Sequence, residues 1–284
     1  MTEHHNPMLL TELILYALKR TTDYDFTRYA VAAMERRVDS FIKREEVSDK
    51  LEILQRIAEG DTELMSRLIQ SLTVTHSRFF RDADYFDCIQ HQVIPKLKAF
   101  PKIRVWSLGC STGEEVYSLA ILLDLAGLLP QCSIMGTDIN TGALDKAKTG
   151  CYELERLEDL QHSFKALKLP HTPSLLDYVE LKENHFQFVG RLREVCHFRR
   201  HNLVKDASLG TMHLVSCRNV LIYLHPNEQE RVIQELLVPS IELGGYLVLG
   251  EAENISDLAH YLDLLKLGFG VNIYQNTVNE RIIG

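Results

Sequence analysis

The sequence predicts an α/β protein in which a largely parallel sheet follows an all-helical N-terminal region. Two observations indicate this fold class. Near the N-terminus, apolar residues recur at helical spacing in LLTELILYAL, AVAAMERRVDSFIKR, KLEILQRIAE and ELMSRLIQSLTV. After Pro101, short apolar runs alternate with helical ones, which is the pattern of parallel strands joined by helices.

The expected elements of the sheet follow in order along the chain. IRVWSLGC predicts a first strand and EEVYSLAILLDLAGLL the helix after it, and CSIMGTDI and TGALDKAKTG repeat the pair. HLVSCRNVLIYL predicts a third strand, NEQERVIQELLVPSI a helix, GGYLVLGEAENI a fourth strand and LGFGVNIYQ a last one. Residues from about 150 to 200 break the alternation. HFQFVG and REVCHFRRHNL predict strands there, whereas the stretch between Cys151 and His185 predicts no definite element.

Composition narrows the possible functions. A chain of 284 residues with 45 % hydrophobic and 25 % charged residues is typical of a soluble globular protein. Its formal net charge of −8 argues against general nucleic-acid binding, which needs a basic excess. The sequence contains no secretory leader and no apolar run of about 18 residues, so we expect a cytoplasmic protein without membrane insertion. The six cysteines form no C-x-x-C pair, which indicates reduced thiols and no metal site.

The strongest chemical signal is the segment WSLGCSTGEEVYS, between a predicted strand and a predicted helix. Gly109 and Gly113 allow a tight turn and close approach to a ligand. The segment lacks the G-x-G-x-x-G pattern of a dinucleotide fingerprint, and it is not a phosphate-binding P-loop, because no lysine follows Gly113. Glu114 and Glu115 would repel a diphosphate but tolerate a cationic ligand, which points to S-adenosylmethionine. For one of the two acids, the general preference of acids for a helix N-terminus is also sufficient.

Asp138 ends the second predicted strand, 25 residues after Gly113. An acid at this place in an open α/β sheet accepts hydrogen bonds from ribose hydroxyl groups. The alternative is that Asp138 only caps the following helix. The glycine-containing segment upstream favours the ribose interpretation.

Several segments together resemble the CheR-type chemotaxis receptor methyltransferases. They are LTVTHSRFFRD, GCSTGEEVYSLA, GTDINTGALDKAKTGCY, HFRRHNLV, SCRNVLIYL and GGYLVLGEAENI, and the similarity runs from about residue 10 to about 275. The resemblance implies a Rossmann-like S-adenosylmethionine-dependent methyltransferase domain with a helical N-terminal domain and a small inserted antiparallel β-subdomain. We expect the helical domain and linker over residues 1–85, the methyltransferase domain over 86–284 and the insertion at about 150–200.

The resemblance also implies an activity and a partner. The activity is transfer of a methyl group from S-adenosylmethionine to glutamate side chains, giving methyl esters and S-adenosylhomocysteine. The partners are the cytoplasmic helices of chemoreceptors, and we expect a monomeric enzyme that binds no metal and no nucleic acid.

The family's functional residues fall on definite positions of this chain. The implied cofactor contacts are Thr75, Ser77, Arg81, Gly109, Glu115, Asp138, Asn202, Leu203, Arg218 and Asn219. Arg81 and Tyr223 would line the acceptor side. Three positions depart from the family pattern, which usually has Asn at Thr75, Asp at His213 and His at Glu251. A hydroxyl replaces only part of an amide's hydrogen bonding, so the role of Thr75 is the least secure.

The chemistry gives Arg81 a specific task. A glutamate is ionised at neutral pH, so it needs alignment with the methyl donor rather than a strong base. A site that contains Glu115 and Asp138 would repel this acceptor, and a planar, permanently charged guanidinium offsets the repulsion. The alternatives are a surface salt bridge of Arg81 with Asp82 or Asp84 and a core position for Tyr223.

A basic segment stands out in this acidic chain. Between Arg28 and Arg44 there are five cationic and two acidic residues. On a helix, Arg37 and Arg44 share one face, and Arg36 and Lys43 share an adjacent strip. Such a run is often only a solvated helix face. With the resemblance, it predicts a docking surface for acidic receptor helices formed by Arg36, Arg37, Lys43 and Arg44.

Two other functions are compatible with these observations. One is a methyltransferase of the same fold that acts on a small molecule or on another protein. The other is a non-catalytic module that senses S-adenosylmethionine or binds a partner. The helical region with its basic face argues against a small substrate, and the presence of Asp138, Arg81 and Tyr223 argues against a non-catalytic role.

Overall fold

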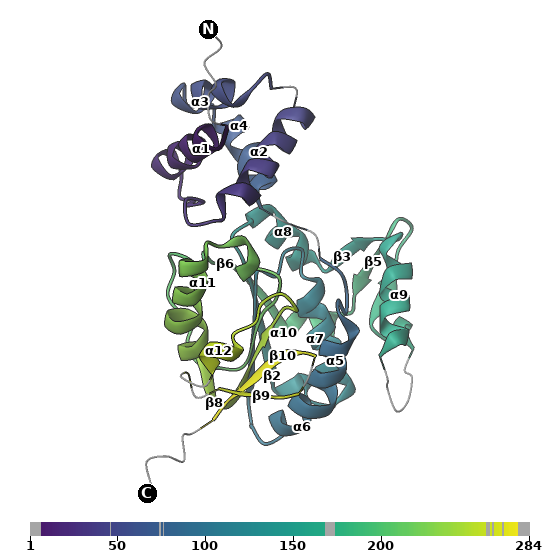
Figure 1. Ribbon diagram of the computed structural model, residues 1–284. Coiled ribbons are helices and arrows are strands. Elements are labelled where there is room, and N and C mark those ends of the chain that lie inside the picture. The colour runs from purple at the N-terminus through teal and green to yellow at the C-terminus, as the bar shows by residue number, and fades with distance from the viewer. Residues whose placement is uncertain are drawn as a thin grey trace, which may run out of the picture. The chain divides into compact units, whose positions relative to one another are not determined.

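The computed structural model describes residues 7–45, 47–73, 75, 77–167, 174–259, 262, 264–268 and 270–277 (Figure 1). The chain divides into two compact units. The helical unit comprises Met1–Val74 and Ile222–Glu230, and the catalytic unit comprises Thr75–Leu221 and Arg231–Gly284. The predicted methyltransferase domain was continuous from residue 86, whereas the structure groups Ile222–Glu230 with the helices of the N-terminal region.

The helical unit contains the helices that the apolar spacing predicts. They are α1 (Pro7–Thr21), α2 (Val31–Arg44), α3 (Lys50–Ala58) and α4 (Thr62–Leu72). Asp49 and Asp61 cap α3 and α4, since their carboxylates accept hydrogen bonds from backbone N–H groups of the first turn. The apolar faces meet in one core, formed mainly by Ile14, Leu18, Phe26, Met34, Val38, Phe41, Ile53, Leu64 and Leu68.

The catalytic unit is built on a sheet whose described strands follow the order β6-β2-β1-β7-β8-β10-β9. The strands are β1 (Ile103–Leu108), β2 (Cys132–Asp138), β6 (Cys196–Arg200), β7 (Met212–Cys217), β8 (Ile241–Leu249), β9 (Leu264–Lys266) and β10 (Asn272–Asn276). The pairs from β6 to β8 are parallel, and β10 runs antiparallel to both of its neighbours. This arrangement confirms the predicted α/β class. β1 lies between β2 and β7, so the segments that leave these three strands emerge at one edge of the sheet.

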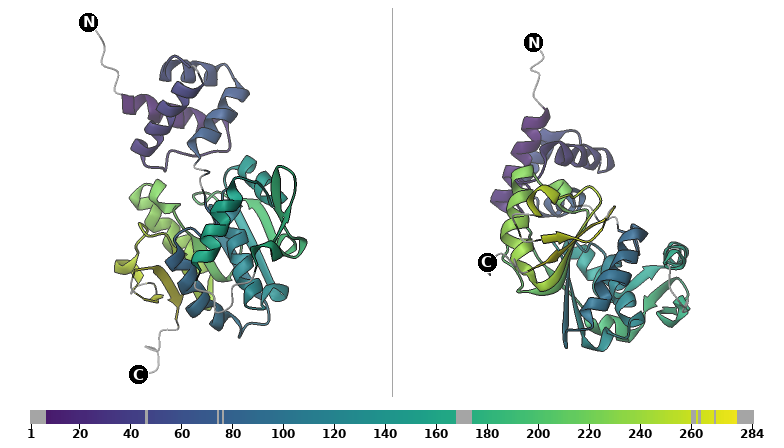
Figure 2. Two further views of the ribbon diagram at one scale, coloured as in Figure 1. Left: turned by 90° about the vertical axis from the view of Figure 1, so that its right-hand side faces the viewer. Right: turned by 60° about the horizontal axis from the view of Figure 1, so that its bottom comes forward.

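Helices cover the sheet on both faces (Figures 1 and 2). They are α5 (Ala83–Cys88), α6 (Ile94–Leu97), α7 (Glu114–Leu125), α8 (Thr141–Thr149), α10 (Gly190–Val195) and α12 (Ser256–Ala259). Helix α11 (Pro226–Val232) lies mostly in the segment that is grouped with the helical unit. A π-helical turn at Ile89–Val93 joins α5 to α6, and α11 continues into a second one at Ile233–Leu237. Helix α7 is buried almost all round, which explains why its sequence is apolar on every face.

A small antiparallel sheet, in the order β3-β5-β4, accounts for the stretch that breaks the alternation. Its elements are β3 (Cys151–Glu153), α9 (Arg156–Ala166), a 3-10 turn (Leu175–Asp177), β4 (Val179–Leu181) and β5 (His185–Phe188). This is the β-subdomain that the resemblance implies. HFQFVG contains β5, as predicted, whereas REVCHFRRHNL begins as the end of α10 and becomes β6 only from Cys196. Phe79, from the segment before α5, packs edge-on against Tyr152 and Phe188 of this sheet.

Candidate active site

The segment after β1 turns through left-handed backbone conformations. The φ angles are +64° at Gly109, +52° at Ser111 and +93° at Gly113. A Cβ atom at Gly109 would lie 2.4 Å from a methyl carbon of Val220, and one at Gly113 would lie 2.9 Å from Ala147. Glycine is therefore required at both positions by conformation and by space. The backbone loop that results lies at the carboxyl end of β1, where open α/β sheets bind ligands.

Asp138 is joined to this loop. One carboxylate oxygen accepts a hydrogen bond from the Ser111 backbone N–H at 2.8 Å, and the other accepts one from Asn140 N–H at 2.8 Å. The cap of α8 is Asn140, whose side chain accepts the Ala143 N–H, so the capping alternative for Asp138 does not apply. Burial raises the pKa of Asp138, and the N–H donors partly offset that rise. The half-buried carboxylate can accept about four hydrogen bonds and keeps capacity for a ligand hydroxyl.

Glu115, on the first turn of α7, has two partners. One oxygen accepts from the Ser107 hydroxyl at 2.8 Å, and the other lies 3.1 Å from a guanidinium nitrogen of Arg218. Arg218 also donates to Asp82 and to the carbonyl oxygen of Arg81, each at 2.8 Å. Its side chain is only 3 % exposed. Arg218, a predicted cofactor contact, therefore joins the end of β7 both to α7 and to the segment that carries Arg81.

Glu114 has a different role from its neighbour. Its side chain is completely buried and lies 2.5 Å from Arg156, at the start of α9. Arg156 also donates to the carbonyl oxygen of Ser77 at 2.9 Å, and Thr112 donates to Glu114 at 2.6 Å. Each of the two glutamates is thus paired with an arginine. The two arginines compensate part of the negative charge on which the argument against a diphosphate rests.

Five buried polar atoms of residues at this site have no hydrogen-bond partner among the described residues, and three of them are Glu114 Oε2, His201 Nδ1 and Arg218 Nε. The other two belong to neutral side chains and are the amide nitrogen of Asn202 and the hydroxyl oxygen of Ser111. Asn202 directly follows His201, whose N–H donates to the Asp138 carbonyl at 3.0 Å. Its own side-chain oxygen accepts from Val204 N–H at 3.0 Å. Buried polar atoms are usually satisfied, so these two fit a polar ligand such as the adenosyl part of S-adenosylmethionine. Leu203, also a predicted cofactor contact, is half-buried beside Asn202.

Glu253 was not predicted as a site residue, although it lies in GGYLVLGEAENI. Its buried carboxylate accepts four backbone N–H groups, each at 2.7 Å, from Asn219, Val220, Leu221 and Gly250. Asn219, a predicted cofactor contact, has a φ of +60°, which is uncommon for a residue with a side chain. Glu253 therefore fixes the loop that leaves β7. In the sequence Glu253 is one of two acids in this segment, and nothing distinguishes it from Glu251.

The linker residues differ in accessibility. Thr75 is exposed and Ser77 is half-buried, whereas Phe79 and Phe80 are each 2 % exposed. Phe80 has a φ of +48°, and its N–H donates to the Ser118 hydroxyl at 3.0 Å. These anchors fix the backbone beside Arg81, whose side chain is 42 % exposed. The Nε atom of Arg81 lies 3.9 Å from Asp82, so the alternative salt bridge is a long contact.

The remaining predicted residues belong to the helical unit. Tyr223 is half-buried, with the Arg37 guanidinium 4.6 Å from the centre of its ring. Arg36 and Lys43 are exposed on α2, and neither forms an ion pair with a described residue. Arg44 is 58 % exposed and lies 3.3 Å from Glu45. The four cations of the predicted docking surface are therefore not equivalent, because Arg37 is turned toward Tyr223.

Two of the departures from the family pattern have a structural description. The Nδ1 atom of His213 accepts the Arg104 N–H at 2.9 Å, and burial lowers the pKa of this buried imidazole. Glu251 is exposed, and its carbonyl oxygen accepts from Asn272 at 3.1 Å. Cys110 and Cys217 are buried beside the site, and burial raises the pKa of both thiols, which makes them poor nucleophiles.

The described ranges contain neither a candidate metal site nor a candidate membrane-spanning helix. No group of three or more His, Cys, Asp or Glu side chains there could hold a metal ion. No helix in the same part of the chain is long and apolar enough to cross a bilayer.

An open sheet with a glycine-containing loop after β1 and an acid at the end of β2 is the arrangement with which α/β folds bind an adenosine-containing cofactor, and it fits the predicted S-adenosylmethionine-dependent methyltransferase. Comparison with known proteins agrees. The model of the "CheR methyltransferase, SAM binding domain" matches residues 75–270, which is more than half of the chain. The protein belongs to the CheR methyltransferase family.

Three relatives illustrate this membership. The "Putative methyltransferase Cher3" of Pseudomonas putida is 34 % identical over 263 residues, covering 93 % of this chain and 94 % of that protein. A "Chemotaxis protein methyltransferase" of Listeria innocua is 32 % identical, covering 86 % and 89 %. "Chemotaxis protein methyltransferase 2" of Pseudomonas aeruginosa is 33 % identical, covering 68 % of each chain.

Proposed function

We propose that this methyltransferase esterifies glutamate side chains on the cytoplasmic helices of chemoreceptors. The carrying observation is a cofactor site in which two neutral side chains have unpartnered buried polar atoms, in a chain whose relatives include chemotaxis protein methyltransferases. We place the enzyme in the cytoplasm as a monomer. The products are glutamate methyl esters and S-adenosylhomocysteine.

The residues around β1, β2 and β6 would hold the cofactor. Asp138 would accept hydrogen bonds from the ribose hydroxyl groups, and Asn202 and Ser111 would use their free polar atoms. Glu115, Gly109, Leu203, Arg218, Asn219, Thr75 and Ser77 complete the proposed set. When bound, S-adenosylmethionine supplies a methyl group whose bond to sulfur breaks as an acceptor oxygen attacks the methyl carbon.

The acceptor side needs positive charge more than it needs a base. A glutamate carboxylate is already ionised at neutral pH, so no protein group has to remove a proton. Arg81 would orient this carboxylate and offset the negative charge of Asp138. The Tyr223 hydroxyl would donate a hydrogen bond to the acceptor. Exclusion of water and in-line alignment are then the main contributions of the protein.

The receptor would dock through the basic face of α2. Arg36 and Lys43 project from it with exposed side chains, and Arg44 is exposed beside Glu45. Exposed charges of this kind steer an oppositely charged partner and accelerate encounter more than they strengthen the final complex. Arg37 is in the same segment, but its guanidinium lies over the Tyr223 ring.

A methyl-labelling experiment tests the proposal. The enzyme is incubated with S-adenosylmethionine labelled in its methyl group and with receptor cytoplasmic fragments, and a fragment whose acceptor glutamates are changed to alanine serves as the control. We expect label in the first fragment only, released as methanol in mild base. Label that survives base would indicate N-, C- or ether-type methylation and would overturn the proposal.

A further inference from the structure

The segment Ile222–Glu230 is held by the helical unit through its backbone. The Ala30 N–H donates to the Tyr223 carbonyl at 2.9 Å, and the His225 N–H donates to the Arg28 carbonyl at 2.9 Å. Between these bonds, Tyr29 and Leu224 form an antiparallel bridge. The short connection that precedes α2 therefore pairs with the residues just before α11 in the manner of two strands.

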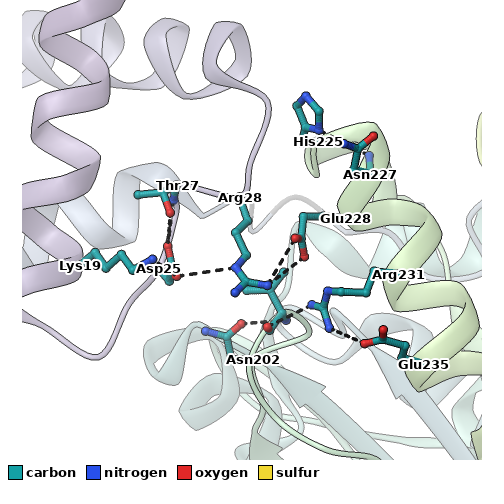
Figure 3. Close-up of polar contacts among 11 residues, drawn as sticks. Lys19, Asp25, Thr27, Arg28, Asn202, His225, Asn227, Glu228, Arg231 and Glu235 are labelled. Carbon is teal, nitrogen blue, oxygen red and sulfur yellow. Dashed lines mark hydrogen bonds and ion pairs between the residues drawn. The ribbon is translucent and has the colours of Figure 1, made fainter.

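Ion pairs strengthen this attachment (Figure 3). Arg28 reaches both carboxylate oxygens of Glu228, at 3.2 and 3.3 Å. Its Nε atom lies 3.9 Å from the buried carboxylate of Asp25, which in turn pairs with Lys19 at 2.9 Å. This chain of charges runs from the end of α1 to the start of α11. The attachment is thus built from several independent contacts.

Arg37 holds the side chain at the centre of the segment. Its guanidinium lies 4.6 Å from the centre of the Tyr223 ring, and it also donates a hydrogen bond to the carbonyl oxygen of Leu72. Burial lowers the pKa of Arg37, which remains a cation at every physiological pH. A guanidinium held by a carbonyl at one side and an aromatic face at the other favours this orientation of the ring by about 0.5–2 kcal/mol.

The other end of the segment is also fixed. Leu221, two residues before Tyr223, donates its N–H to Glu253 at 2.7 Å. The backbone approaching Tyr223 is therefore anchored to the sheet by Glu253, while the Tyr223 ring is oriented by Arg37. An aromatic hydroxyl that must meet an acceptor carboxylate has to be placed to within a fraction of an ångström, since small misplacements reduce catalysis steeply.

We propose that Arg37 is a positioning residue for Tyr223 and affects methyl transfer through that side chain. The inference rests on the proposed function, in which Tyr223 contacts the acceptor. This proposal gives Arg37 a different role from Arg36 and Lys43. Those two act on receptor affinity, whereas Arg37 acts on turnover.

Steady-state kinetics with a chemoreceptor cytoplasmic fragment test this division. Arg37→Gln should lower kcat on the order of tenfold, with less than about a twofold change in KM for the fragment. Arg37→Lys should restore part of the rate, because an ammonium keeps the charge over the ring but loses the planar stack. Arg20→Gln, which removes an exposed cation from α1, is the matched control and should leave both constants unchanged. A raised KM with normal kcat in Arg37→Gln would make Arg37 a docking residue and overturn the proposal.

A double-mutant cycle shows whether Arg37 acts through Tyr223. In a Tyr223→Phe background, Arg37→Gln should cause little further loss of kcat, because the group that it positions is already gone. Multiplied losses would mean independent roles and would overturn the proposal. If Tyr223→Phe itself turns over normally, the fault lies with the proposed function of Tyr223.

A spectroscopic readout does not depend on activity. In protein labelled with 3-fluorotyrosine, the ¹⁹F resonance of Tyr223 is assigned by its loss in Tyr223→Phe. Arg37→Gln should shift this resonance and Arg20→Gln should not. An unmoved resonance in a variant that keeps its wild-type melting temperature would show that Arg37 does not hold the ring, whatever the substrate of the enzyme.

Discussion

The charged side chains that we assign to the cofactor and those that we assign to the protein substrate differ in how firmly the protein holds them. Asp138 and Glu115 are tied to backbone N–H groups, a hydroxyl or an arginine. By contrast, the Arg81 side chain is 42 % exposed, and Arg36 and Lys43 project from α2 without ion pairs among the described residues. A small ligand gains from groups that are already fixed, whereas a protein substrate needs charges that it can reach.

Removing Arg81 should have the largest effect. We expect Arg81→Ala to lower kcat/KM on the order of 100-fold or more, because alignment and charge compensation are lost together. Arg81→Lys should recover only part of the rate, since an ammonium lacks the planar fork. Methyl transfer to a receptor fragment is the measurement, and Arg78→Ala, an exposed arginine of the same linker, is the control. Near-normal turnover in Arg81→Ala would remove this residue from the acceptor side.

A substitution at Asp138 tests the side chains that we assign to the cofactor. Asp138→Ala should weaken S-adenosylhomocysteine binding by roughly 1.5–3 kcal/mol, the scale of a charge-assisted hydrogen bond. Titration calorimetry measures this change, and Asp145→Ala, which removes an exposed acid from α8, should bind as the wild type does. Equal affinities in a folded Asp138→Ala protein would exclude Asp138 from the cofactor site.

The same carboxylate should make cofactor binding depend on pH. Burial raises the pKa of Asp138. As the pH falls, this carboxylate therefore begins to take up a proton at a higher pH than an ordinary aspartate does. Ligand hydroxyl donors favour the ionised form and would lower that pKa, so binding near the raised pKa should release a proton. Affinity should therefore fall as the pH drops through it. Calorimetry in two buffers of different ionisation enthalpy measures the release, which Asp138→Asn should abolish. Proton uptake would contradict the assignment.

The comparison also separates what the sequence could predict from what it could not. The loop after β1 and the acid at the end of β2 were predictable, because Gly109, Gly113 and Asp138 stand where local patterns place a strand end. The partners of the two glutamates were not predictable. Glu115 meets Arg218 across 103 residues of sequence, and Glu114 meets Arg156 across 42. No periodicity specifies such pairings, since they exist only after the sheet and the β-subdomain have formed.

The different environment of Arg37 within the basic segment could not be predicted from the sequence for the same reason. On a helical wheel, Arg37 and Arg44 share a face, and nothing in the segment distinguishes Arg37 from the cations beside it. The difference comes from Tyr223, which is far away along the chain and lies under the Arg37 guanidinium. Glu253 illustrates a similar limit, because its four N–H donors come from two separate loops.

The smallest expected effect belongs to the exposed charges of α2. Reversing two of them, with Arg36→Glu and Lys43→Glu, should raise the KM for a receptor fragment by roughly 3- to 10-fold at low salt, since exposed pairs contribute little each. The difference from wild type should shrink in about 1 M salt, where the screening length is only about 3 Å. Cofactor affinity should not change, because neither residue lies in the catalytic unit. Arg20→Glu, which reverses an exposed charge on α1 instead, is the control. An unchanged KM in this variant would show that the effect comes from the face of α2 and not from the net charge of the protein. Wild-type activity that is the same at low and high salt would show that this face of α2 is only solvated.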